Sequence, residues 1–291
     1  MLVRLPLPPL DRLAGVDRSL LFGPPSRMFW LKLVVVPAFC LGLIMSPRLW
    51  IGPRSYPLAP VFDRLPSASP IVDYSMSAGL LGVAVAILLA PRPRKLITAF
   101  LAILVALCLF DQTRWQPWVF FYGALFGVLA SYSWEREDLA DRDRALNLAR
   151  LIVAGTHLFS GLQKINLNFF RDDFPWIVSP ITDAVPAAAP ALHWFGIAAP
   201  FIQIAFALGL LTRRFRRISL VAAVAMHLFI LAMFGPFGLN WNTIIWPCTL
   251  TMAVLDIILF SGRITLGAIY FGAADISITP ERFSYSSASH C

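Results

Sequence analysis

Long apolar runs separated by short polar links make up most of this 291-residue chain. Each run approaches the roughly 20 residues that an α-helix needs to cross the hydrocarbon core of a bilayer. Long stretches that alternate apolar and polar residues, as the strands of a membrane barrel do, are lacking. The pattern therefore predicts an all-α fold: a polytopic integral membrane helical bundle with about eight transmembrane helices. The expected spans are residues 28–46, 74–90, 95–110, 116–132, 145–163, 191–211, 218–234 and 241–260.

Composition excludes a water-soluble domain with a single core. Apolar residues make up 58% of the chain and charged residues only 14%, whereas a soluble domain carries about a quarter charged residues. The expected partner is a lipid bilayer, and the expected location is a multi-pass position in the cell or plasma membrane. The four cysteines occur singly and form no C-x-x-C pair. They predict neither a disulfide framework nor a metal site, so no metal is implied.

The positive charge of the chain follows the predicted topology. If the N-terminus is cytoplasmic, 18 of the 24 Lys and Arg residues fall in cytoplasmic segments and six on the other face. This asymmetry predicts an N-in and C-in orientation. Topology and anionic lipid contacts then explain the net charge of +8, with no nucleic acid as a partner. Cytoplasmic tails are expected at residues 1–27 and 263–291, on either side of a transmembrane domain at residues 28–262.

The fifth expected span carries a polar stripe. His157, Ser160 and Lys164 recur at helical spacing and, with Gly161, occupy one face of the helix. Polar groups are costly in hydrocarbon, so this face should contact protein and not lipid. Two interpretations of Lys164 stay open. It is either a snorkelling or structural cation near the outer end of the span, or a buried amine whose lowered pKa allows it to act as a general base.

Two further polar sites lie near the same outer face. His227, in the seventh expected span, either reaches the cavity that Lys164 lines or is a hydrogen-bonded packing residue. Asp111, Gln112 and Arg114 are compressed between the third and fourth expected spans. They either pair locally or form the polar rim of the same cavity.

Three segments, in order along the chain, resemble landmarks of the HTTM domain, the membrane domain of vitamin K-dependent gamma-carboxylases. They are the strings DQ-x-R-x-QPW at 111–118, FSGLQKIN at 159–166, and MHL at 226–228 with a later FG pair at 237–238. The resemblance covers roughly residues 27–262. It implies that Lys164 matches the lysine that deprotonates a reduced quinone cofactor on the lumenal side. Pro117 and Trp118 stand where animal carboxylases carry a histidine, which speaks against carboxylation of protein glutamate.

The leading hypothesis is an integral membrane protein of HTTM type, an enzyme that acts on a lipid-soluble quinone or similar hydrophobic substrate at the outer face. Lys164 is the expected catalytic base, and a quinone or quinol similar to vitamin K is the expected cofactor. The expected substrate-binding residues are His157, Ser160, His227, Asp111, Gln112 and Arg114. The alternative is a non-catalytic membrane partner or maturation factor that uses the same polar seam to hold its helices together or to dock a peptide.

Overall fold

The computed structural model describes residues 26–51, 59–62, 64–65, 69–135, 138–236, 238–241 and 243–261. These residues belong to one compact unit. The expected tails at 1–27 and 263–291 lie outside the described residues, apart from Ser26 and Arg27. The expected boundaries of the transmembrane domain stay predictions.

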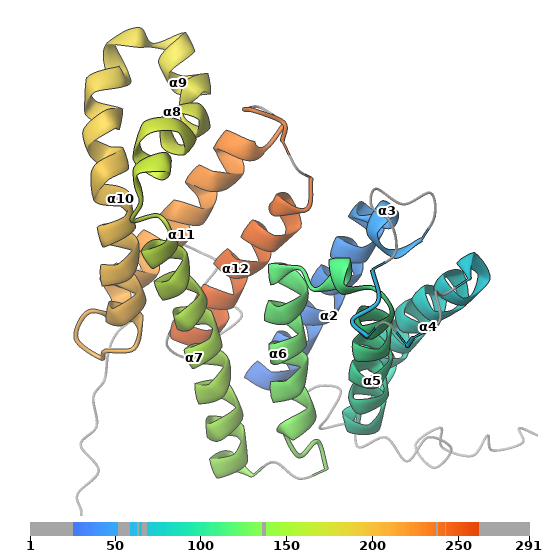
Figure 1. Cartoon of the computed structure of the whole chain (residues 1–291). Helices are drawn as coiled ribbons and strands as arrows, with labels where there is room; N and C mark the ends of the chain where they lie inside the picture. The colour runs from blue at the N-terminus through green and yellow to red at the C-terminus, as the bar shows by residue number, and fades with distance from the viewer. Residues whose placement is uncertain are drawn as a thin grey trace, which may run out of the picture. The chain divides into compact units, whose positions relative to one another are not determined.

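Every regular element in the described part of the chain is helical, as the sequence predicts (Figure 1). Eight of these helices have at least 15 residues and overlap the eight apolar runs. They are α2 (Arg27–Met45), α4 (Pro70–Leu89), α5 (Arg94–Phe110), α6 (Pro117–Ser131), α7 (Leu139–Gln163), α10 (Ala189–Leu210), α11 (Arg216–Phe234) and α12 (Ile245–Phe260). The short elements are α3 (Pro47–Trp50), η2 (Gln112–Arg114), η3 (Phe169–Asp173), α8 (Phe174–Ile177), α9 (Ser179–Ala184) and η4 (Pro186–Ala188).

Five helical segments of the described chain are long and apolar enough to cross a membrane. They are α2, α4, α7, α11 and the continuous stretch Pro186–Leu210 that contains α10. Helices α6 and α12 are apolar but shorter, at 15 and 16 residues. By length and composition, the chain is a multi-pass membrane protein.

The helix boundaries follow from local sequence. Pro70 and Pro117 stand in the first turns of α4 and α6, where the missing N–H of proline costs no hydrogen bond. Helix α7 begins at Leu139, six residues before the expected start of the fifth span at 145. The Asp138 side chain accepts a hydrogen bond from the Ala140 N–H and so caps this end. The additional turns are charged, which is why hydropathy alone places the start too late.

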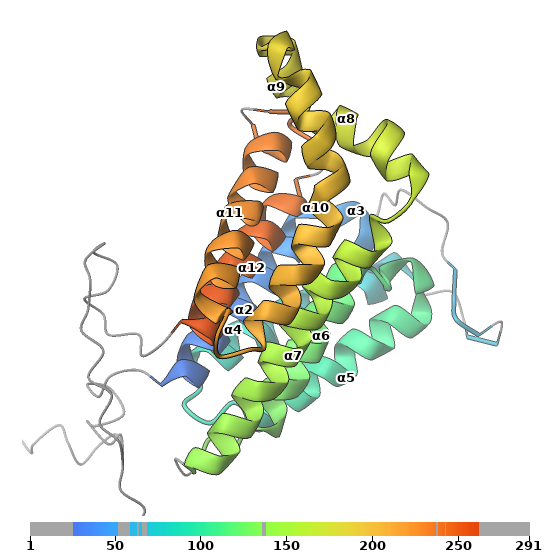
Figure 2. The same cartoon turned by 90° about the vertical axis from the view of Figure 1, so that its left-hand side faces the viewer.

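Each long helix packs against its neighbours in the sequence, and α2 and α12 also contact helices far from them in the sequence (Figures 1 and 2). Helix α10 packs against both α7 and α11, and α11 packs against α12. Helix α12 returns to contact α2 and α7, while α2 also contacts α4 and α6. As a result, α7, α10, α11 and α12 surround a common interior, which holds the candidate site.

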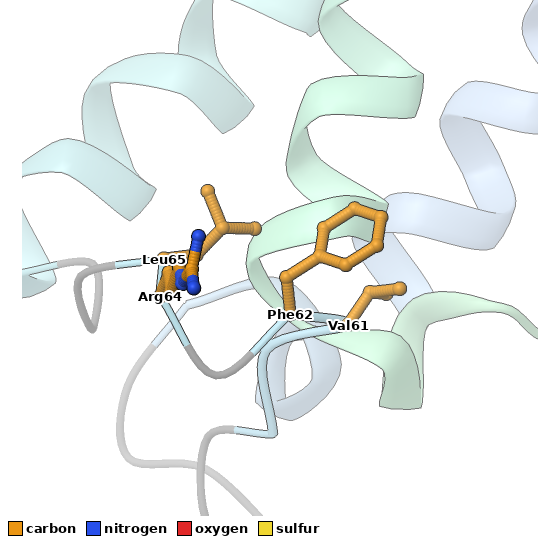
Figure 3. Close-up of a pocket in the computed structure, with 4 residues that line it drawn as sticks. All are labelled: Val61, Phe62, Arg64 and Leu65. Carbon is orange, nitrogen blue, oxygen red and sulfur yellow. The ribbon is translucent and has the colours of Figure 1, made fainter.

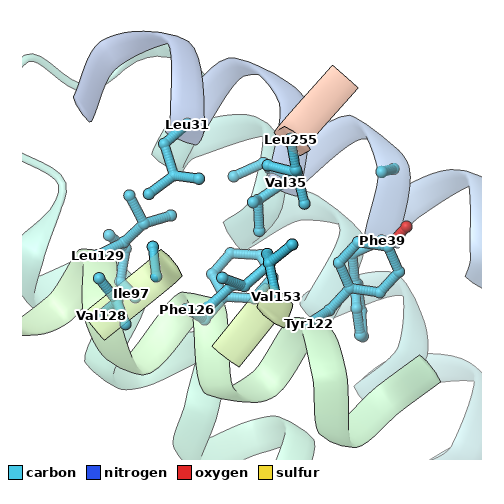
Figure 4. Packing of buried hydrophobic residues seen from close by; sticks show 14 of the residues in the cluster. Leu31, Val35, Phe39, Ile97, Tyr122, Phe126, Val128, Leu129, Val153 and Leu255 are labelled. Carbon is cyan, nitrogen blue, oxygen red and sulfur yellow. The ribbon is translucent and has the colours of Figure 1, made fainter. Parts of the chain in front are cut away.

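Buried aliphatic and aromatic side chains pack between α2, α5 and α6 (Figure 4). The ring centroid of Phe39 lies 5.2 Å from that of Phe100 and 5.7 Å from that of Phe126, both with edge-on geometry. The ring centroids of Phe100 and Phe126 are 4.3 Å apart. Lipid tails are as apolar as these side chains, so close packing, more than exclusion of water, holds the helices together in a bilayer.

Several basic side chains cap the C-terminal ends of helices. Lys32 Nζ donates to two backbone carbonyls at the end of α4, at 3.2 and 3.0 Å. Arg150 Nε donates to a carbonyl in the last turn of α12 at 2.8 Å, and Arg216 Nε to the last residue of α10 at 3.2 Å. These cations satisfy carbonyls that have no partner within their helix and complement the helix dipole. Some of the Lys and Arg residues that produce the charge asymmetry in the sequence therefore also stabilise helix ends.

Candidate functional site

Helices α7, α10, α11 and α12 line a pocket of about 150 Å³. His157 and Ser160 contribute to it from α7, Gln203 from α10 and His227 from α11. Cys248 lies on the α12 side. The structure thus brings His157 and Ser160 of α7 together with His227 of α11, the three residues that the sequence analysis considered for one cavity.

A cluster of two histidines and one carboxylate adjoins this pocket. His157 Nε2 lies 3.1 Å from each of the two carboxylate oxygens of Asp256. His227 Nε2 lies 3.6 Å from Asp256 Oδ2, and the two imidazole centroids are 5.2 Å apart. Asp256 is fully buried, and His157 and His227 are only 1% and 6% exposed. Because burial of a lone carboxylate is costly, the hydrogen bond to His157 compensates Asp256. His227 Nε2 lies beyond hydrogen-bond distance.

Asp256 is the site residue that the sequence analysis missed. It is the single acidic residue of α12 and stands in an otherwise apolar run. An ionisable residue inside a membrane helix is a candidate for function in itself, so this sequence feature was sufficient to select it. Its partners, however, lie on α7 and α11, and no spacing along the chain reveals that pairing. The three side chains place one donor atom each within 4.8 Å of one another, a possible metal-binding geometry that sequence spacing did not predict.

Lys164 forms the C-cap of α7 and lies at the margin of the pocket. Its Nζ donates to the Ser160 carbonyl oxygen at 2.9 Å, to Ser160 Oγ at 2.6 Å and to Gln203 Oε1 at 3.0 Å. Since Ser160 and Gln203 both line the pocket, the amine is hydrogen-bonded to two of the side chains that form it. Gln203, 4% exposed, is a second contact residue that the sequence analysis did not select.

The electrostatic setting of Lys164 supports proton exchange near neutral pH. The residue lies just beyond the apolar segment that ends at Gln163. Burial lowers the pKa of the Lys164 ammonium from 10.5 to about 8, because water is removed from the charged form. The three acceptors around Nζ also match the three protons of an ammonium. The three acceptors favour a structural cation. The lowered pKa favours an amine that can release its proton.

Gly161 allows α7 and α10 to approach closely beside this amine. A Cβ at position 161 would lie 2.8 Å from Ile204 Cγ1 and 3.1 Å from the carbonyl oxygen of Pro200. Small residues at such crossings let helix backbones come together in membranes. The contact brings Gln203 within hydrogen-bonding distance of Lys164, so the glycine supports the margin of the pocket.

Asp111, Gln112 and Arg114 lie in a different place. Arg114 is fully buried and contacts Asp73 Oδ1 at 2.8 Å and Asp111 Oδ2 at 3.9 Å. Gln112 is exposed. The guanidinium also donates to the backbone carbonyls of Leu49, Trp50 and Leu107. This cluster ties together α3, α4, α5 and η2, and none of the three expected residues is among the described residues that line the pocket. Their role in binding a substrate stays a prediction.

A larger hollow of about 620 Å³ lies against the segment 61–65 (Figure 3). Its described lining consists of Val61, Phe62, Arg64 and Leu65. Arg64 is the one titratable side chain among these described lining residues, so they offer no paired acid and base. The smaller pocket between α7, α10, α11 and α12, with several polar groups converging on it, is the stronger functional candidate.

Comparison with protein-family models, with curated proteins and with solved structures finds no match to this chain. The resemblance to the HTTM domain therefore depends on the three sequence segments themselves.

Proposed function

We propose that this chain is a multi-pass membrane protein of HTTM type that binds a lipid-soluble, quinone-like molecule in the pocket between α7, α10, α11 and α12. In this proposal the eight long helices all cross the membrane, with both termini in the cytoplasm and the Lys164 end of α7 at the outer face. Lys164 acts as the base that accepts a proton from the reduced ring.

The observation that carries the proposal is the convergence of polar groups on a pocket inside an apolar bundle. Ser160 and Gln203 connect the pocket to the Lys164 amine, and His157 and His227 lie on its wall. An apolar cavity of about 150 Å³ in another protein accommodates benzene, so a pocket of this size matches one aromatic ring and not a whole isoprenoid lipid. The apolar tail of such a molecule would lie along the helices.

The chemistry follows from these groups. A hydroquinone hydroxyl that replaces Ser160 Oγ as a neighbour of Lys164 Nζ can pass its proton to the neutral amine, and the resulting anion then lies beside an ammonium. The lowered pKa of Lys164, about 8, makes a fraction of the neutral amine present near neutral pH. Gln203 orients the amine in both protonation states, because its Oε1 accepts from Nζ.

Binding of a short-chain benzoquinol to the purified full chain in detergent tests the proposal. We expect the wild type to bind about one molecule per chain and Lys164→Met to bind at least about tenfold more weakly, a loss of roughly 1.4 kcal/mol. Lys95→Met is the matched control, because Lys95 is exposed near the start of α5. Equal binding by all three proteins would remove Lys164 from the site.

The non-catalytic alternative is favoured by a specific observation as well. The Lys164 ammonium already has three acceptors within 3.0 Å, which suits a seam between α7 and α10. A membrane partner or maturation factor would need only that seam. In that case Lys164→Met loses thermal stability at pH 7, and the wild type shows no saturable binding of the quinol.

A further inference from the structure

The buried carboxylate and its two histidines have the dimensions of a metal site. Two donors bound to one ion at about 2.0–2.1 Å are separated by about 3.3 Å in a tetrahedral site. The observed separations from Asp256 oxygens are 3.1 Å to His157 Nε2 and 3.6 Å to His227 Nε2. These distances bracket the tetrahedral value, and all three donor atoms lie within 4.8 Å of one another. The side chains would have to draw together where a separation exceeds the tetrahedral value.

His227 provides an independent indication of a ligand. It is 6% exposed, and neither of its ring nitrogens has a hydrogen-bond partner. Buried polar groups are nearly always paired, and leaving one unpaired costs about 1–3 kcal/mol. The hydrogen bond between His157 and Asp256 links α7 to α12, which accounts for these two buried residues. It does not account for the second imidazole, that of His227. An ion bound through His227 Nε2 would account for it.

The chemistry of the donors restricts the ion. Two neutral imidazoles and one carboxylate suit Zn²⁺ or Fe²⁺, whereas Mg²⁺ and Ca²⁺ prefer oxygen ligands throughout. The dication would also offset the negative charge of Asp256, which is fully buried. Three protein ligands leave at least one coordination position for a further ligand. His157 and His227 both line the pocket, so that position would face it.

We propose that His157, His227 and Asp256 bind one divalent transition-metal ion of the Zn²⁺ or Fe²⁺ type, with an open coordination position toward the pocket. The proposal needs only these three residues and does not depend on the identity of any quinone. The site lies at the interface of α7, α11 and α12, and each of these helices contributes one ligand.

Metal titration of the full chain in detergent tests this site. After removal of metal with a chelator, we expect Zn²⁺ to bind with one-to-one stoichiometry and a Kd below about 1 µM. Co²⁺ should give the visible absorption of a site with nitrogen and oxygen ligands. His227→Leu and Asp256→Asn should weaken Zn²⁺ binding by more than about 100-fold, the most that loss of an outer-shell partner alone costs. His193→Leu, which removes an exposed histidine of α10, should bind as the wild type does.

His227→Leu also controls for folding, because it removes a side chain with no hydrogen-bond partner. Without metal, its melting temperature should equal or exceed that of the wild type. Excess Zn²⁺ should raise the melting temperature of the wild type and not that of His227→Leu. The proposal is overturned if the wild type binds no Zn²⁺ or Co²⁺ in this range. It is equally overturned if His227→Leu retains wild-type affinity.

Discussion

The protonation of Lys164 provides a sharp prediction about stability and pH. In the folded chain its pKa is about 8, against 10.5 for an exposed lysine. Between these two values the unfolded chain binds more protons than the folded chain, so the free energy of unfolding rises with pH across this window. The difference corresponds to at most about 3 kcal/mol. Below about pH 8 the folded protein carries the full cost of the buried ammonium, and above about pH 10.5 that cost is gone.

Lys164→Met isolates this effect. The melting temperature of the wild type minus that of Lys164→Met should rise with pH from pH 7.5 to 10.5. A change of about 3 kcal/mol corresponds to roughly 6–12 °C for a domain of this size. Intrinsic tryptophan fluorescence during heating in detergent measures it, and other groups that titrate at high pH cancel in the difference. Lys95→Met, in which an exposed lysine is lost, should show no such trend against the wild type. A difference for Lys164→Met that is constant with pH would refute the reasoning, because the ammonium would then bear no desolvation cost.

Two further substitutions test the architecture around the pocket. Gly161→Leu should destabilise the protein by about 1–3 kcal/mol and weaken quinol binding, because the new side chain collides with Ile204. Gly155→Leu, on the same helix with open space around the Cβ, should change neither, and equal behaviour of the two variants would contradict the close approach of α7 and α10. Arg114→Met should cost about 3–5 kcal/mol, as expected when one member of a buried ion pair is removed. A double-mutant cycle with Asp73→Asn in thermal unfolding should give a coupling of about 1–3 kcal/mol, and additive effects would show that the pair does not interact.

The positions of the helices could be predicted from the sequence because apolar runs of membrane length dominate it. The segment between α7 and α10 was not expected to be helical. It folds into η3, α8, α9 and η4, in pieces of three to six residues, too short to show a helical period.

The candidate site could be predicted only in part. The stripe of His157, Ser160 and Lys164 is visible because all three residues lie on one helix. Asp256 and Gln203 complete the arrangement from α12 and α10, and their contact depends on how those helices are rotated. The face that α12 exposes carries apolar residues, Leu250 and Ile257, as its buried faces mostly do. Its sequence therefore has no contrast between a polar and an apolar face that would predict the rotation. Asp111 and Arg114 were placed correctly between two spans. In the structure Arg114 contacts Asp111 and Asp73, and neither Asp111 nor Arg114 is among the described residues that line the pocket.

Photo-crosslinking tests the central claim, that a quinone-like ring occupies this pocket, most directly. An azido-benzoquinone is irradiated with the purified full chain in detergent, and labelled peptides are identified by mass spectrometry. We expect labels on pocket residues such as Thr156, Met226 and Met252, and their loss when excess unlabelled quinone is present. Labels confined to exposed positions such as Phe159 and Leu162, unaffected by the competitor, would contradict the account.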